Sequence, residues 1–407
     1  MTPVALGMPR RPPGAPAPVP RRTDVTPPDV PGPDVAAPDV AVPDGTQRDA
    51  TARDTTVHGG SVHGGLVHGG PLVDRFGRVA TDLRVSLTDR CNLRCRYCMP
   101  PEGLPATPAP ELLTDDEVIR LVTVAVRYLG VEAVRFTGGE PLLRPGLEAL
   151  VEATAALRTG SGRSPQISLT TNGIGLDRRA DRLAAAGLSR VNVSLDTLDR
   201  DRFARITHRD RLPDVLAGLR AAVTAGLSPV KVNAVLLRGI NDDEAVRLLH
   251  WAFEQGYLLR FIEQMPLDPH GAWDRASLVT AEEILSALRT EFTLTPFPGR
   301  SRGAAPAETW RVSGGRPTDT RTVGIVASVT RSFCSDCDRT RLTADGQLRS
   351  CLFAREETDL RGLLRSGAGD EEVARSWRAA MWVKAAGHGS DDGSFPRPTR
   401  PMSAIGG

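Results

Sequence analysis

The chain has 407 residues, with 51 basic and 49 acidic side chains, six cysteines and 4% aromatic residues. Its length allows two or three domains with a large core. The formal net charge of +2 gives no overall basic field, which argues against bulk attraction to nucleic acid or to an anionic membrane surface. The sequence contains no apolar run of about 18 residues and no apolar signal-peptide core near its start, so we expect a cytoplasmic protein.

Residues 1–72 differ in composition from the rest of the chain. Thirteen of the 33 prolines fall in the first 50 residues, and no Phe, Trp, Tyr or Cys appears before Phe76. Pro-Asp-Val and Val-His-Gly-Gly are each repeated three times in this tract. Such low-complexity sequence cannot bury enough apolar surface to offset the entropy of ordering it. We predict that residues 1–72 are disordered, and that His58, His63 and His68 bind metal only weakly.

Residues 73–292 alternate between apolar, strand-like runs and amphipathic, helical stretches. The pattern predicts strands at Leu83–Leu87, Val131–Phe136, Gln166–Thr170, Arg190–Leu195, Val230–Val235 and Leu259–Ile262. It predicts helices around Asp115–Tyr128, Gly146–Leu157, Asp177–Ala186, Leu212–Ala225, Asn241–Gln255 and Ala281–Phe292. Six alternations favour an α/β fold whose parallel sheet, with right-handed crossovers, curls into a full or partial barrel. In such a fold, catalytic groups lie on loops at the carboxyl ends of the strands.

Residues 293–407 lack this regular alternation and are predicted to form an appended element. A Gly/Pro/Arg-rich stretch leads into a strand-like run at Thr322–Val329, a cysteine cluster and a helical stretch at Glu371–Lys384. The tail from Gly387 to Gly407 is rich in Gly, Ser and Pro. We expect the appended element to cover one end of the sheet.

The six cysteines fall into two groups of three with different spacings. A C-x3-C-x2-C run directly follows the first predicted strand, and a C-x2-C-x13-C run lies in the appended element. The first group is Cys91, Cys95 and Cys98, and the second is Cys334, Cys337 and Cys351. A structural zinc site needs four closed ligands, so three thiolates fit better with a metal centre that keeps one position open. The first triad favours an iron–sulfur cluster, whereas zinc remains an alternative for the second.

The residues around the first triad resemble the signature of the radical S-adenosylmethionine (SAM) superfamily. They run from Thr88 to Pro100 and read TDRCNLRCRYCMP. Further motifs are similar to those of the GTP 3',8-cyclase family, also called molybdenum cofactor biosynthesis protein A. These motifs are RFTGGEP at 135–141, TTNG at 170–173, NVSLD at 192–196, RFIE at 260–263 and IGG at 405–407. The resemblance covers residues 74–407.

The resemblance implies a partial (β/α)6 barrel of the TIM type with a C-terminal extension, and one 4Fe-4S cluster on each cysteine triad. SAM would bind the open iron of the first cluster, whose electron cleaves it to methionine and a 5'-deoxyadenosyl radical. The guanine ring of GTP would bind the open iron of the second cluster. The radical would take hydrogen from C3' of the ribose, and C3' would then attack C8. This lyase reaction gives 3',8-cyclo-7,8-dihydro-GTP, in the first step of molybdenum cofactor biosynthesis.

The resemblance also assigns site residues by motif match. It assigns SAM binding to Tyr97, Gly139, Ser194 and Met265, and GTP binding to Arg84, Arg135, Thr170, Lys231, Arg339 and Arg341. It assigns catalysis to Arg260 and to the terminal Gly406 and Gly407. The residue types support a polyanion pocket, because Arg84, Arg135 and Lys231 fall on strands, where solvated charges are unusual. Asp338 stands where asparagine is common in the family, and this extra carboxylate could pair with Arg339.

The partners implied by the resemblance are an electron donor such as flavodoxin or ferredoxin, and the next enzyme of the molybdopterin pathway. The sequence leaves open whether the protein is a monomer or a homodimer. One alternative function is that of a peptide-modifying radical SAM enzyme with an auxiliary cluster, which would usually carry more downstream cysteines. Another is a non-catalytic zinc or electron-transfer module, which would not need the SAM motifs at the strand ends.

Overall fold

The computed structural model describes residues 70–268, 271, 273–297, 303–313, 321–387, 398 and 400–406. The predicted disorder of residues 1–72, with its histidine repeats, and the predicted role of Gly407 lie outside these residues, apart from 70–72. Contacts divide the chain into two units, Met1–Gly60 and Ser61–Gly407, and the second unit contains every described element. No helix in the described ranges is long and apolar enough to cross a membrane.

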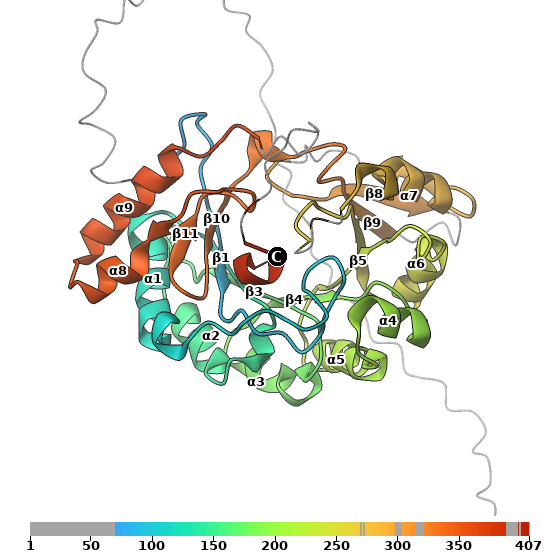
Figure 1. The fold of residues 1–407 in the computed structure, drawn as a ribbon, viewed down its shortest axis with the longest axis horizontal. Helices are drawn as coiled ribbons and strands as arrows, with labels where there is room; N and C mark the ends of the chain where they lie inside the picture. Colours follow the sequence, from blue (N-terminus) through green and yellow to red (C-terminus); the bar gives the residue numbers. More distant parts are fainter. Residues whose placement is uncertain are drawn as a thin grey trace, which may run out of the picture. The chain divides into compact units, whose positions relative to one another are not determined.

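Six parallel strands form the middle of a twelve-stranded sheet, and they follow one another in sequence order (Figure 1). They are β1 (Asp82–Ser86), β2 (Ala133–Thr137), β3 (Gln166–Thr171), β4 (Arg190–Ser194), β5 (Val230–Val235) and β6 (Leu258–Ile262). All five neighbouring pairs are parallel, as the predicted crossovers require. The sheet curls, and the helices cover its outer face (Figure 1). The predicted partial (β/α)6 barrel is therefore confirmed.

The helices of the barrel lie close to the predicted ranges. They are α1 (Asp115–Tyr128), α2 (Leu147–Ala155), α3 (Ala180–Ala185), α4 (Arg200–Thr207), α5 (Leu212–Thr224), α6 (Ala245–Glu254) and α7 (Ala281–Leu288). Short 3-10 turns occur at η1 (Ala109–Glu111), η2 (Pro141–Leu143), η3 (Leu176–Arg178), η4 (Arg275–Ser277) and η5 (Cys334–Asp336). The helix predicted at 177–186 is divided between η3 and α3. The prediction missed α4, because four of its eight residues are charged and its apolar stripe is short.

The C-terminal element extends both edges of the sheet, which corrects the expectation that it only covers one end. Beside β6 lie β9 (Arg321–Val326), β8 (Glu308–Ser313) and β7 (Thr293–Pro296). Beside β1 lie β10 (Arg339–Leu342), β11 (Gln347–Arg349) and β12 (Thr358–Asp359). The helices α8 (Leu360–Arg365) and α9 (Asp370–Trp382) follow, and α10 (Met402–Ile405) ends the described chain. Between β9 and β10 the chain therefore passes from one edge of the sheet to the other.

Alternation along the strands separates the core from the interior of the barrel. Leu83, Val85 and Phe136 are fully or almost fully buried in the hydrophobic core, as the outward face of a helix-covered strand requires. The intervening residues of β1 and β2 include Arg84 and Arg135, which line an interior cavity. The same alternation that builds the core thus directs charged side chains inward.

The N-terminus of α1 supports a testable prediction. Thr114 and Glu117 form a capping box, in which the Thr114 hydroxyl accepts from the Glu117 amide at 3.2 Å. Thr114→Ala removes this acceptor, so we expect the free energy of unfolding to fall by about 1 kcal/mol. The loss would appear as a lower urea midpoint with an unchanged slope.

Thr224→Ala is the matched control for this variant. The Thr224 hydroxyl is exposed and donates to the carbonyl of Arg220 within α5. Its removal should change the free energy of unfolding by less than about 0.5 kcal/mol. Equal losses in the two variants would contradict the capping role.

Candidate active site

Two adjoining cavities lie on the inner side of the sheet. The first cavity is lined by Cys91, Cys95 and Cys98, and the second by Cys334, Cys337 and Cys351. Both cavities are also lined by Thr170, Asn233, Ile262 and Met265. The two sequence triads therefore face neighbouring spaces that meet at the carboxyl ends of β3, β5 and β6.

The first triad lies on the loop that follows β1, and this loop is anchored to the missed helix α4. The amides of Arg94 and Arg96 donate to the carbonyls of Thr207 and Ile206 at 2.9 and 3.0 Å. The side-chain amide of Asn172 contacts the Cys91 sulfur at 3.7 Å. These bonds hold the cysteine loop against the barrel before any cofactor binds.

Burial governs the chemistry of the first triad. Burial, and then the neighbouring Cys91, raise the pKa of Cys98 to about 12, and burial also raises the pKa of Cys95 well above its usual value. In the ranges that the structure covers, no three His, Cys, Asp or Glu side chains are placed to hold a single metal ion. Three thiols around one cavity instead fit a four-iron cluster, in which each thiolate binds a different iron and compensates for its lost proton.

All four residues assigned to SAM line the first cavity: Tyr97, Gly139, Ser194 and Met265. The Tyr97 hydroxyl donates to Asp196 at 2.8 Å, so its phenol is already fixed by a partner in the protein. Gly139 packs so closely on the backbone of Arg90 that a Cβ there would overlap the Arg90 carbonyl. Gly139 thus has a packing reason of its own, and the SAM contacts of these residues remain predictions.

Five arginines line the second cavity, together with Thr170. They are Arg84, Arg135, Arg260, Arg339 and Arg341. Burial, and then repulsion from Arg135, lower the pKa of Arg84 to about 9, while burial and Arg84 lower the pKa of Arg341 to about 9. No acidic side chain is among the described residues that line this cavity. The site therefore concentrates positive charge that a polyanion would neutralise.

Lys231 lies near this charge but does not line either cavity. Burial, followed by Arg260, Arg190 and Arg135, lowers its pKa to about 7. The structure therefore brings Lys231 close to the arginines electrostatically. A direct contact between Lys231 and a ligand stays a prediction.

Lys384 is a site residue that the sequence reasoning missed. Its ammonium is buried and donates to the Cys337 sulfur at 3.4 Å, the Cys337 carbonyl at 3.2 Å and the Arg339 carbonyl at 2.8 Å. Burial alone would raise the pKa of Cys337, but Lys384 and Arg339 hold it below its usual value. The scarcity of lysine in this chain was the signal, because it applies to Lys384 as much as to Lys231.

The C-terminal segment reaches both cavities. Figure 1 shows this red segment inside the curve of the sheet. The Gly406 carbonyl accepts from Arg341 at 3.0 Å, and the Ile405 carbonyl accepts from Ser86 at 2.8 Å. Gly406 has φ +86°, and a Cβ there would overlap Ser86, so the position requires glycine. Met402 and Ser403 line the first cavity.

Two carboxylates near the cavities have structural partners. Asp338 pairs with Arg339 at 3.8 Å, as expected for this departure from the family pattern. Glu263 accepts from the amides of Ala281 and Val329, each at 2.8 Å, and so ties β6 to α7 and to the segment after β9. The alternative that Arg260 pairs with Glu263 is not favoured, because these groups occupy both carboxylate oxygens.

Comparisons with known proteins agree along most of the chain. The family described as "Radical SAM superfamily" matches residues 85–252, and "Molybdenum Cofactor Synthesis C" matches residues 257–390. The GTP 3',8-cyclase of Streptomyces coelicolor is 65% identical over 336 residues, which cover 83% of this chain and 96% of the relative. The GTP 3',8-cyclase of Mycolicibacterium smegmatis is 61% identical over 337 residues, covering 83% of this chain and 92% of the relative.

The Lys384 contact predicts a measurable change in thiol reactivity. Thiolate is the form that reacts with iodoacetamide, so the rate of Cys337 alkylation in metal-free protein rises through the Cys337 pKa. Lys384→Met removes a cation that favours the thiolate, and we expect the midpoint of the rate–pH profile to move to higher pH. Peptide mass spectrometry would follow the modification.

Lys231→Met is the control, because it removes the other lysine and Lys231 is not among the groups that shift Cys337. The midpoint for Cys337 should then match that of the unmodified chain. Identical profiles for Lys384→Met and the unmodified chain would refute the proposed influence of Lys384.

Proposed function

The chain belongs to the GTP 3',8-cyclase family of the radical SAM superfamily, and from this premise we propose how its own residues carry out the cyclisation of GTP. The reaction uses SAM and two 4Fe-4S clusters, and it forms the bond between C3' and C8 that begins molybdenum cofactor biosynthesis. The observation that carries the assignment of roles is the meeting of the two cavities, one with each cysteine triad, at four shared residues.

The first cavity holds the first cluster and SAM. Cys91, Cys95 and Cys98 would ligate the cluster, which when bound supplies the electron that cleaves SAM to methionine and a 5'-deoxyadenosyl radical. Gly139 brings backbone close to the cysteine loop, where the polar end of SAM would lie. Met402 and Ser403 of the tail border the same space and help to exclude water from the radical.

The second cavity holds GTP, with Cys334, Cys337 and Cys351 as ligands of the second cluster. Arg84, Arg135, Arg339 and Arg341 neutralise the triphosphate, which relieves the repulsion that lowers the pKa of Arg84. The ribose would then lie toward the shared residues, such as Thr170 and Asn233. That position brings C3' next to the space in which SAM is cleaved.

Arg260 is the residue we assign to the later proton step. It lies on β6 and faces the second cavity, and Gly324 on β9 leaves room for its side chain. Burial, and then repulsion from Arg190, lower the pKa of Arg260 to about 10, so it releases a proton more readily than an exposed arginine. We propose that Arg260 assists protonation after the ring closes.

The partners follow from the chemistry of the reaction. We infer an external electron donor such as flavodoxin or ferredoxin, because the clusters must be reduced before each turnover. The product would pass to the next enzyme of the molybdopterin pathway. Six free cysteines need a reducing compartment, which supports a cytoplasmic location.

An anaerobic turnover assay tests this function. With dithionite as reductant and about eight irons per chain, the protein should form 5'-deoxyadenosine and the cyclised nucleotide only when GTP is present. Cys95→Ala should abolish SAM cleavage, whereas Cys351→Ala should retain cleavage and lose the cyclised product. Fully loaded protein that forms no cyclised nucleotide would overturn the assignment.

Lys231 predicts a proton uptake that accompanies GTP binding. With its pKa near 7, Lys231 is mostly neutral at pH 8, and a bound triphosphate would favour its charged form. We expect up to about one proton per GTP to be taken up at pH 8 and little at pH 6. Calorimetry in buffers of different ionisation enthalpy would measure this uptake.

Lys231→Met separates the lysine from the titration of GTP itself. The difference in proton uptake between this variant and the unmodified chain should be present at pH 8 and absent at pH 6. Equal uptake at both pH values would show that Lys231 does not respond to the triphosphate.

A further inference from the structure

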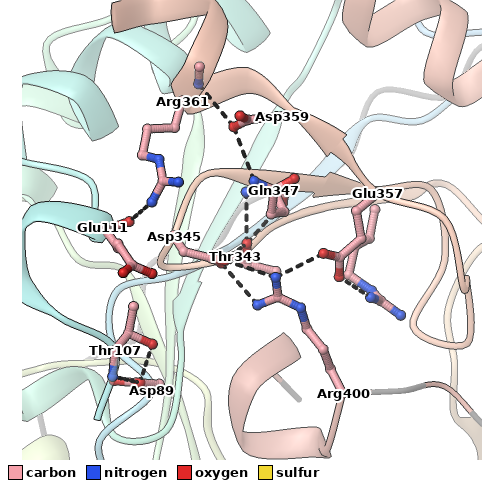
Figure 2. A network of polar contacts seen from close by, with 12 residues as sticks. Asp89, Thr107, Glu111, Thr343, Asp345, Gln347, Glu357, Asp359, Arg361 and Arg400 are labelled. Atoms are coloured by element: carbon pink, nitrogen blue, oxygen red, sulfur yellow. Dashed lines mark hydrogen bonds and ion pairs between the residues drawn. The ribbon is translucent and has the colours of Figure 1, made fainter.

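Arg400 begins the C-terminal segment and lies in a network of charges outside the two cavities. Its guanidinium donates to both carboxylate oxygens of Asp345, at 3.1 and 2.8 Å, and contacts Glu357 at 2.8 Å. Figure 2 shows the guanidinium between these two carboxylates. The Arg400 side chain is 29% exposed, and its two partners are less exposed than that. This bidentate, two-carboxylate contact is more specific than an isolated surface ion pair.

Both carboxylates are fixed to the hairpin formed by β10 and β11. Asp345 lies in the turn of the hairpin and accepts from the Thr343 hydroxyl at 2.6 Å. Glu357 also pairs with Arg349 of β11, a side chain that is fully buried. This hairpin carries Arg339 and Arg341 and leads directly to Cys351. The Arg400 network therefore attaches the tail to the part of the fold that builds the second cavity.

The other end of the tail is attached to the same hairpin. Gly406 accepts from Arg341, and Ser403 contacts Cys98 of the first triad through both its side chain and its backbone. Between these points Ile405 is buried in a small apolar cluster with Leu267, Leu352 and Phe353. The tail is thus held at both ends by the hairpin and in its middle by the first cysteine loop.

We propose that Arg400 is a positioning residue that latches the tail, so that Ser403 meets Cys98 and Gly406 meets Arg341 at the same time. Without Arg400, the apolar contacts and single hydrogen bonds of α10 must hold the segment alone. Two neighbouring carboxylates would also lose their shared cation, which disfavours the closed position of the tail further. For catalysis this inference rests on the proposed function, whereas the latch itself is a property of the fold.

The test combines hydrogen exchange with turnover in the cluster-loaded protein. In Arg400→Ala, we expect the amides of Ala404 and Gly406, which bond to Pro401 and Met402, to exchange at least about tenfold faster. Exchange in α1 and the iron content should stay unchanged. The yield of cyclised nucleotide per 5'-deoxyadenosine should fall about tenfold, because a misplaced tail uncouples SAM cleavage from reaction with GTP.

Two further variants separate a latch from a general loss of stability. Arg400→Lys should recover part of the protection, since an ammonium can reach one carboxylate but cannot bind Asp345 in a bidentate way. Arg200→Ala removes an exposed bidentate pair with Asp210 and should change neither readout.

The outcomes distinguish the two proposals. Unchanged tail exchange in Arg400→Ala, or faster exchange spread equally over the whole chain, would overturn the latch. Faster tail exchange with unchanged coupling would overturn its role in catalysis. If even the unmodified chain forms no cyclised nucleotide, the proposed function fails, and the exchange measurement still decides whether Arg400 holds the tail.

Discussion

The pairing of β9 with one edge of the six-stranded sheet and of β10 with the other is the constraint on which the site depends. Because the chain must pass between these edges, the segment with Cys334 and Cys337 crosses the opening of the curled sheet. The parallel pairing of β10 with β1 then sets Arg341 directly beside Arg84. One topological choice therefore places the second triad opposite the first and brings together arginines from distant parts of the chain.

The resulting concentration of buried positive charge is costly in an empty site, and the fold reduces this cost in part. Burial would raise the pKa of Asp82, but Arg84 and Arg135 hold it below its usual value, and Asp82 contacts Arg135 at 3.7 Å. A single carboxylate cannot balance five arginines. The remaining imbalance supplies a large part of the attraction for a triphosphate, so stability and binding are opposed at this cavity.

The barrel could be predicted from sequence because each strand and helix of the six units carries its own periodicity. The cysteine triads were also visible, since ligand spacing on a loop is local. β10 was not, because Arg339 and Arg341 give it a surface-like pattern although all four of its residues are buried. The contacts of Lys384 and Arg400 join residues 45 or more positions apart, and no local pattern encodes such a contact.

The register of β1 has a consequence for how the protein matures. One neighbour of this strand, β2, follows it closely, but the other, β10, pairs Arg339 with Asp82 across almost the whole folded chain. During synthesis, the edge of β1 and the adjoining cysteine loop therefore stay uncovered until the C-terminal strands emerge from the ribosome. That interval leaves the first triad accessible to the machinery that delivers iron and sulfide. It also makes the nascent barrel dependent on protection from edge-to-edge association.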